Sequence, residues 1–188
     1  EIKFILKTAG DYLTRVPKKR DVKSVFAGLR PLAAPKADGK KTKEISRGHK
    51  IVVGLSSLVT ITGGKWTTYR KIGEDAVNQA AIVAGLEEKP SVTKSLAIHG
   101  HLEDHNPELE YAHYGFDRED LLELVKASPD LAEPLHPDLS FTKVEVVWAV
   151  RNEMARTIED VLARRVRALF LDAKASIEMA EIVSHIMT

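Results

Sequence analysis

The chain has 188 residues, of which 44% are hydrophobic, and it contains no cysteine. The absence of cysteine excludes disulfide frameworks, thiolate metal sites and cysteine nucleophiles. The formal net charge is only +1, but basic residues predominate in residues 1–75 and acidic residues in 76–188. A basic half favours an anionic ligand such as a nucleotide, a phosphate compound or nucleic acid. No apolar run approaches the ~20 residues that span a bilayer, so any membrane contact is expected to be peripheral.

The front of the chain combines helical and extended patterns. Residues 1–13 carry apolar side chains at helical spacing, which predicts a helix. The strand-like run at 22–32 and the β-branched runs at 50–55 and 58–62 predict strands, the last two as a hairpin. From residue 68 to 85 the apolar period is again that of a helix, and a glycine ends it.

The back of the chain reads as helical. Helices are predicted from residue 117 to 127 and from about 169 to 186. Two more helices begin at capping boxes, in which a threonine and an acidic residue three positions later exchange hydrogen bonds with the backbone. These pairs are Thr142 with Glu145 and Thr157 with Asp160.

These patterns together predict an α+β protein. Residues 1–88 are expected to form a partial mixed or antiparallel sheet with helices, residues 89–107 a linker, and residues 108–188 an all-helical domain. The stretch 33–44 is rich in Pro, Gly and Lys, which is typical of an exposed loop.

The most informative stretch joins a predicted strand to a predicted helix through Gly63, Gly64 and Lys65. Two glycines let the backbone approach a flat ligand, and the free N–H groups of a helix start attract an anion. A reduced flavin is such a ligand, because it carries negative charge near N1. The alternative is an ordinary strand-to-helix turn with Thr67 or Thr68 as N-cap and Lys65 solvated.

A phosphate loop of the Walker type is excluded at this turn. That motif needs a glycine where this chain has Val59 and a Ser or Thr where it has Trp66.

Two arginines are candidate anion ligands. Arg30 lies in an apolar strand context, where an unpaired guanidinium is costly, so it is expected to face a carboxylate or an anionic ligand such as phosphate. Arg47 precedes a predicted hairpin, where an exposed surface charge is the simpler interpretation.

Two other clusters have simpler explanations than a binding site. His99, His101, His105 and His113 lie near acidic residues, but their spacing does not fit metal ligation from one helix; we interpret them as a polar linker and predict no metal. The arginines at 164–167 are interspersed with acidic residues along their helix, which favours ion pairs over nucleic-acid contact.

The order of these motifs resembles the carboxy-terminal part of FAD-dependent, quinone-linked glycerol-3-phosphate dehydrogenases. The resemblance covers nearly the whole chain. The residues that carry it are Gly28 to Leu32, Ser46 to His49, Gly63 to Arg70, Glu74 to Val77 and Val150 to Leu171.

The resemblance implies specific roles. Arg30, Arg47 and Lys65 match positions that hold the substrate phosphate, and the flavin contacts match Gly63, Gly64, Lys65, Trp66 and Thr67. No residue of the chain matches a catalytic group. The glycine-rich unit that grips the FAD pyrophosphate is absent, so this chain alone is expected to be inactive.

The resemblance also implies an activity and its partners. The family oxidises glycerol 3-phosphate to dihydroxyacetone phosphate and passes electrons from FAD to quinone. The implied partners are glycerol 3-phosphate, quinone and the amino-terminal FAD-binding part of the same protein, with no nucleic acid. Peripheral contact with the inner face of the cytoplasmic membrane and a homo-oligomer are further expectations.

One rival interpretation comes from the charge asymmetry. It is a non-catalytic helical interaction module whose basic arm binds nucleic acid or an acidic partner. The lysines of residues 36–50 have no interleaved aromatic residues, which single-strand binders use for stacking.

Overall fold

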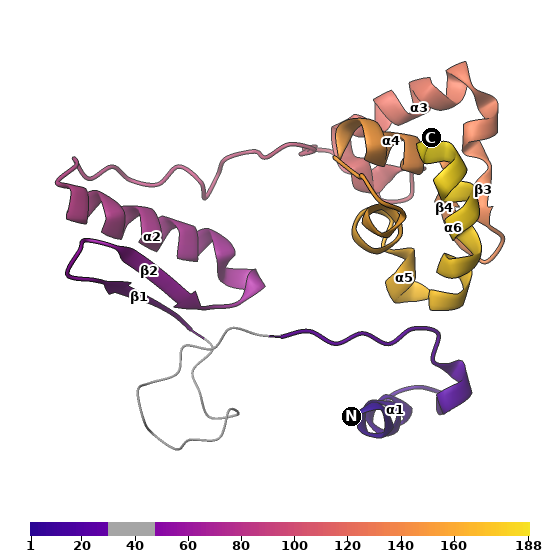
Figure 1. The fold of residues 1–188 in the computed structure, drawn as a ribbon, viewed down its shortest axis with the longest axis horizontal. Helices are drawn as coiled ribbons and strands as arrows, with labels where there is room; N and C mark the ends of the chain where they lie inside the picture. The colour runs from indigo at the N-terminus through magenta and orange to yellow at the C-terminus, as the bar shows by residue number, and fades with distance from the viewer. Residues whose placement is uncertain (30–47) are drawn as a thin grey trace. The chain divides into compact units, whose positions relative to one another are not determined.

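A computed structural model describes residues 1–29 and 48–188 and divides them into two compact units (Figure 1). One unit comprises residues 1–27 and 100–188, and the other residues 28–99. The first 27 residues thus cluster with the helical unit. The predicted loop 33–44, Arg30 and Arg47 lie outside the described residues.

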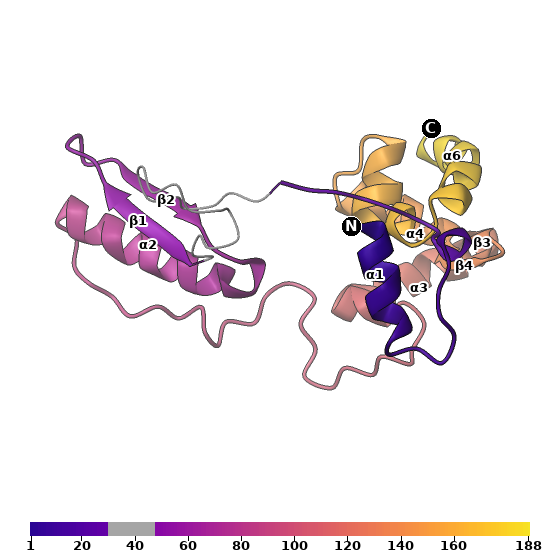
Figure 2. The same ribbon diagram turned by 90° about the horizontal axis from the view of Figure 1, so that it is seen from below.

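The smaller unit is built on a hairpin and a helix. Strands β1 (His49–Val53) and β2 (Val59–Gly63) pair antiparallel, with His49 opposite Gly63. A 3₁₀ turn, η3 (Trp66–Thr68), leads into helix α2 (Tyr69–Ala84), which lies along the hairpin in both ribbon views (Figure 1, Figure 2). The predicted hairpin and helix are confirmed. The helix ends as predicted at Gly85, which has a left-handed φ of 65°.

The helical unit contains short helices around a small hairpin. Its opening helix α1 (Ile2–Gly10) confirms the prediction for residues 1–13, although α1 has no buried residue. The unit also contains a small hairpin, whose two strands of three and four residues are too short to leave a recognisable alternating pattern. The remaining elements are η1 (Lys19–Asp21), η4 (Ala112–Asp117), α3 (Arg118–Ala127), η5 (Pro129–Ala132), β3 (Pro134–His136), β4 (Leu139–Thr142), α4 (Lys143–Asn152), η6 (Asp160–Arg165), α5 (Ala168–Leu171) and α6 (Ala173–Met187).

Both capping boxes are confirmed. At the start of α4, the Thr142 N–H donates to Glu145 Oε2 over 2.7 Å, and the Glu145 side chain is almost fully buried. At the second, the Thr157 N–H donates to Asp160 Oδ2 and the Asp160 N–H to Thr157 Oγ1, over 3.0 and 3.1 Å. A helix containing the π turn η6 follows.

Among residues 1–29 and 48–188, the buried apolar residues all belong to the helical unit. One cluster gathers around Val146, Val161, Met179 and Val183, and a second around Leu121, Val144 and Trp148. In the described part of the smaller unit no residue is buried. Burial of apolar surface therefore stabilises the helical unit far more than the hairpin and α2.

The strand predicted over residues 22–32 is wrong for residues 22–29, which are extended but belong to no sheet. They contact the region where α5 meets α6. The Ser24 hydroxyl donates to the Leu169 carbonyl over 2.6 Å, and the Phe26 and Phe170 rings meet edge to face at 4.9 Å. The spacing of apolar residues predicts an extended segment, but it does not determine whether that segment packs against a strand or against the junction of two helices.

Asp172 breaks the last predicted helix into α5 and α6. Its Oδ1 accepts the N–H groups of Lys174 and Ala175, each over 3.1 Å, which is an N-cap. Its Oδ2 lies 2.9 Å from Lys23 Nζ. Lys23 first, and then the capping amides, hold the pKa of Asp172 below its usual range. One carboxylate thus starts the final helix and fixes the amino-terminal segment.

We predict that hydrogen exchange will separate the two units. Amides of α4 and α6 exchange only on global opening of the core, whereas those of β1, β2 and α2 exchange faster because no buried side chain protects them. Mass spectrometry of peptides from the two units measures this directly. Equal protection in α2 and α6 would contradict the assignment of the core.

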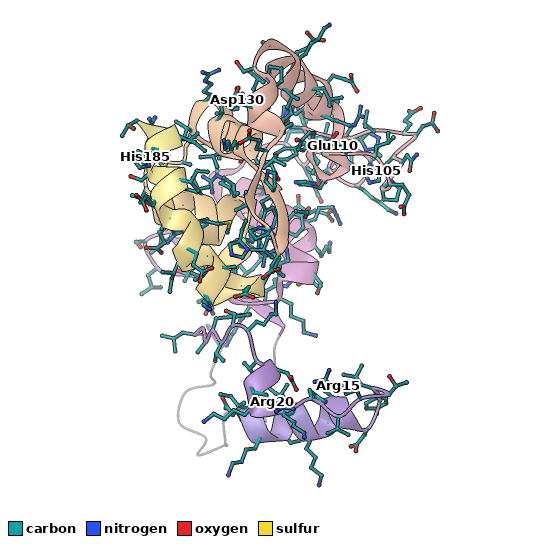
Figure 3. The ribbon with its side chains drawn as sticks, turned by 90° about the vertical axis from the view of Figure 1, so that its right-hand side faces the viewer. Arg15, Arg20, His105, Glu110, Asp130 and His185 are labelled. Carbon is teal, nitrogen blue, oxygen red and sulfur yellow. The ribbon has the colours of Figure 1, made fainter. Side chains whose placement is uncertain are left out.

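We predict that Asp172→Asn weakens the acid dependence of stability in the helical unit. A depressed carboxyl pKa stabilises the fold above the unfolded value, ~4 for Asp, and this stabilisation is lost as pH falls through the folded value. Thermal unfolding between pH 2 and 7 should therefore show a smaller decline in the variant. The matched control is Asp130→Asn, at the exposed position labelled in Figure 3, where the carboxylate has no described partner.

Candidate functional site

The turn between β2 and α2 has a conformation that only glycine adopts readily. Gly63 and Gly64 have φ of 76° and 95°, in a region that costs an L-residue about 1–2 kcal/mol. Lys65 returns to extended backbone, and η3 then leads into α2. The strand therefore ends abruptly, and the amino end of the helix follows within five residues.

Gly64 is also held by its neighbours. A Cβ added at Gly64 would lie 2.5 Å from Ile72 Cδ1 and 3.5 Å from the Cβ of His49. The residue therefore fits between α2 and β1 with room for a hydrogen only. Both the backbone conformation and the packing require glycine there.

An open hollow of about 610 Å³ lies against this turn. Trp66 is 85% exposed and its ring stacks on that of Tyr69, with ring centres 5.2 Å apart and planes at 24°. No described residue accepts a hydrogen bond from the amides of Trp66 and Thr67. The lining residues are Gly63, Gly64, Lys65, Trp66, Thr67, Tyr69 and Ile72.

Ion pairs on α2 surround the base of the turn. His49 Nε2 lies 3.0 Å from Asp75 Oδ2, and Lys71 Nζ lies 2.9 Å from Asp75 Oδ1. Lys71 first, and His49 to a smaller extent, hold the pKa of Asp75 below its usual range. Lys71 and Arg70 do the same for the pKa of Glu74. The carboxylates beneath the turn are therefore ionised near neutral pH.

The predicted flavin-contact residues, from Gly63 to Thr67, form one turn beside one hollow. Lys65 is exposed and makes no ion pair with a described residue, so its ammonium is available to an anion. Thr68 is the N-cap residue of α2, but its hydroxyl donates to the Lys65 carbonyl over 3.0 Å and caps no helix amide. The grouping of Lys65 with Arg30 and Arg47 stays a prediction, because both arginines lie outside the described residues.

His49 and Asp75 are the functional candidates that sequence reasoning missed. They are 26 positions apart, and their contact depends on the β1–β2 register and on the packing of α2. The available signal was weak: a histidine at the start of a β-branched strand and an aspartate in a helix with two basic neighbours.

The histidine stretch and the arginine run lie in the helical unit or at its border. Within residues 1–29 and 48–188, no three His, Asp or Glu side chains gather as a metal site would require. His105 and Glu110 lie on the segment that leads to the helices (Figure 3). Arg164 pairs with Glu159 at 2.7 Å and with Asp160 at 3.2 Å, which confirms the ion pairs predicted there.

No helix of the described chain has the length and apolar character needed to cross a membrane.

Comparison with known proteins identifies the class to which this fold and turn belong. Residues 59–188 match the profile of a family described as the C-terminal domain of alpha-glycerophosphate oxidase. The match contains β2, the glycine turn, α2 and the helices from residue 112 to the end. The chain belongs to this family.

Curated relatives agree with the family match. The chain is 37% identical to a probable mitochondrial glycerol-3-phosphate dehydrogenase of Caenorhabditis elegans, over all of this chain and 29% of the relative. It is 34% identical to a glycerol-3-phosphate dehydrogenase of Mycobacterium leprae, over 89% of this chain and 31% of the relative. It is 33% identical to the mitochondrial enzyme of Rattus norvegicus, over 95% and 27%. The chain thus spans less than a third of the length of each of these relatives.

We predict that Gly64→Ala disorders the turn. The methyl group would meet Ile72, and the positive φ would be strained whatever the space, so we expect a loss of about 1–3 kcal/mol of local stability. Hydrogen exchange of residues 63–72 measures it.

The matched control is Gly73→Ala on α2, where an added Cβ meets no atom within 4 Å. Alanine should there stabilise the helix by up to ~1 kcal/mol. If the two substitutions changed local stability equally, the left-handed conformation of Gly64 would not be what stabilises the turn.

Proposed function

We propose that this chain is the carboxy-terminal part of an FAD-dependent enzyme that oxidises sn-glycerol 3-phosphate to dihydroxyacetone phosphate. One observation carries the proposal. The glycine turn lies within the region that matches the family, and curated relatives of the chain are named glycerol-3-phosphate dehydrogenases. The relatives are about three times longer, so the activity belongs to the longer protein.

The turn is chemically suited to the edge of a flavin. A flat ring needs an open surface without side chains at its closest approach, and Gly63 and Gly64 leave such a surface beside the hollow. The amides of Trp66 and Thr67 and the ammonium of Lys65 would stabilise negative charge there. FAD, when bound, supplies the hydride acceptor. The residues that would contact it are Gly63, Gly64, Lys65, Trp66 and Thr67.

The same turn would orient the substrate. Lys65, with Arg30 and Arg47, would bind the phosphate of glycerol 3-phosphate, because guanidinium and ammonium groups form charge-assisted hydrogen bonds with phosphate oxygens. Holding the phosphate at one end fixes the carbon that loses hydride relative to the cofactor. The group that removes the hydroxyl proton is expected in another part of the protein.

The smaller unit supports a role for the amino-terminal FAD-binding part as a partner. A two-stranded hairpin needs apolar packing against further structure to be stable, and the described residues of this unit include no buried side chain. Val52, Val53, Val77 and Ile82 remain between 42% and 68% exposed. Packing of the amino-terminal part against these side chains would complete the core that the unit lacks.

The remaining assignments follow from the family resemblance. Electrons would pass to a quinone, and the protein would associate peripherally with the inner face of the cytoplasmic membrane as a homo-oligomer. The described helices include no membrane span, which is compatible with peripheral association.

We predict that Lys65→Ala and Arg30→Ala each raise the KM for glycerol 3-phosphate in a protein completed with the amino-terminal part. Loss of one charge-assisted hydrogen bond corresponds to about 1.5–3 kcal/mol, or roughly 10- to 100-fold. The assay follows reduction of an artificial electron acceptor.

Lys50→Ala is the control, because Lys50 is an exposed lysine on β1 with no described ion pair. It should leave KM unchanged. Unchanged KM in both test variants would remove the phosphate assignment.

A further inference from the structure

His49 lies directly behind the glycine turn. It is the first residue of β1 and pairs across the hairpin with Gly63, the last residue of β2. Its Cβ would be 3.5 Å from a Cβ built on Gly64. The imidazole is partly shielded, with 23% of the side chain exposed. The residue therefore contacts the backbone whose conformation defines the candidate site.

The imidazole of His49 is bound to α2 through Asp75. Asp75 Oδ2 is 3.0 Å from His49 Nε2, and a carboxylate can only accept, so Nε2 carries the hydrogen. This bond exists for both the neutral and the charged imidazole. It joins the start of β1 to the second turn of the helix, on either side of the glycines.

The His49–Asp75 bond is not needed to neutralise Asp75, because Lys71 already does so. Its ammonium lies 2.9 Å from Asp75 Oδ1 and 2.7 Å from Glu74 Oε1. The Asp75 carboxylate would therefore keep a cationic partner if His49 were removed. What His49 adds is a connection between strand and helix, which an ion pair within α2 cannot provide.

We infer that His49 and Asp75 are positioning residues, which hold the turn from Gly63 to Thr67 in the conformation that places Lys65 beside the hollow, where it meets an anion. The inference rests on the proposed function for the identity of that anion. It assigns neither residue a contact with substrate or cofactor. Ile72 limits the space at Gly64 from the side of α2. The His49–Asp75 bond holds β1 against the same helix, so the turn is fixed from both β1 and α2.

The first test uses this chain alone and needs no activity. Of the two tryptophans in the sequence, Trp66 lies in the turn and Trp148 in the core of the helical unit. With 5-fluorotryptophan incorporated, the ¹⁹F signal of Trp66 reports the turn, and that of Trp148 serves as an internal reference. Substitution of Trp66 by Phe assigns the two signals.

We expect His49→Ala and Asp75→Ala each to shift or broaden the Trp66 signal, and the double variant to add nothing to the effect of Asp75→Ala. His49→Gln, which keeps an N–H donor, should restore much of the wild-type signal. Lys50→Ala on the same strand should change neither signal. An unchanged Trp66 signal in His49→Ala, or additive effects in the double variant, would overturn the inference.

The second test uses the protein completed with its amino-terminal part. His49→Ala and Asp75→Ala should each raise the KM for glycerol 3-phosphate about two- to tenfold, the range for one lost hydrogen bond, with a smaller effect on kcat. The double variant should match Asp75→Ala, because the His49–Asp75 bond is already lost in that variant.

Lys65→Ala separates failure of this inference from failure of the proposed function. If Lys65→Ala leaves KM unchanged, the phosphate assignment fails, and the ¹⁹F result still decides whether His49 and Asp75 hold the turn. If Lys65→Ala raises KM and His49→Ala does not, the positioning role is wrong.

Discussion

The contact between Gly64 and Ile72 is the constraint on which the candidate site depends. A strand must end and a helix begin within a few residues, and the helix must lie close enough to the hairpin for Ile72 to meet the turn backbone. Only a residue without a side chain satisfies both demands at a φ of 95°. The position of Lys65 beside the hollow follows from this geometry, because Lys65 is the first residue after the two glycines.

The two units are stabilised in different ways. The helical unit has its own core, closed by a buried capping glutamate and by Asp172, so it meets the ordinary requirements of an independent domain. The hairpin unit has well-formed local structure but little burial among its described residues. Polar interactions therefore hold this unit together. They are the hydrogen bonds between β1 and β2, the ion pairs along α2 and the His49–Asp75 bond.

Sequence predicted the local structure better than the contacts between distant segments. The hairpin, α2 and both capping boxes were evident because each depends on residues within a few positions of one another. The extended segment from residue 22 was predicted as a strand, since sequence does not reveal that its neighbour is the α5–α6 junction. The break at Asp172 was missed for a related reason, because an aspartate inside an apolar helical pattern does not show which amides it caps.

The same limit applies to the candidate site. The glycine turn and Lys65 were predicted from their own chemistry and from the family resemblance. His49 and Asp75 depend on strand register, which a single sequence specifies only once the packing of both faces is known.

The attachment of residues 23–26 to the junction of α5 and α6 has a consequence for biosynthesis. The hydroxyl of Ser24 reaches a carbonyl 145 positions later, and Lys23 reaches the aspartate that starts the final helix. Contacts of such long sequence separation form late, because the Leu169 carbonyl is synthesised 145 residues after Ser24. Residues 23–26 must therefore wait for these partners while the intervening residues are synthesised.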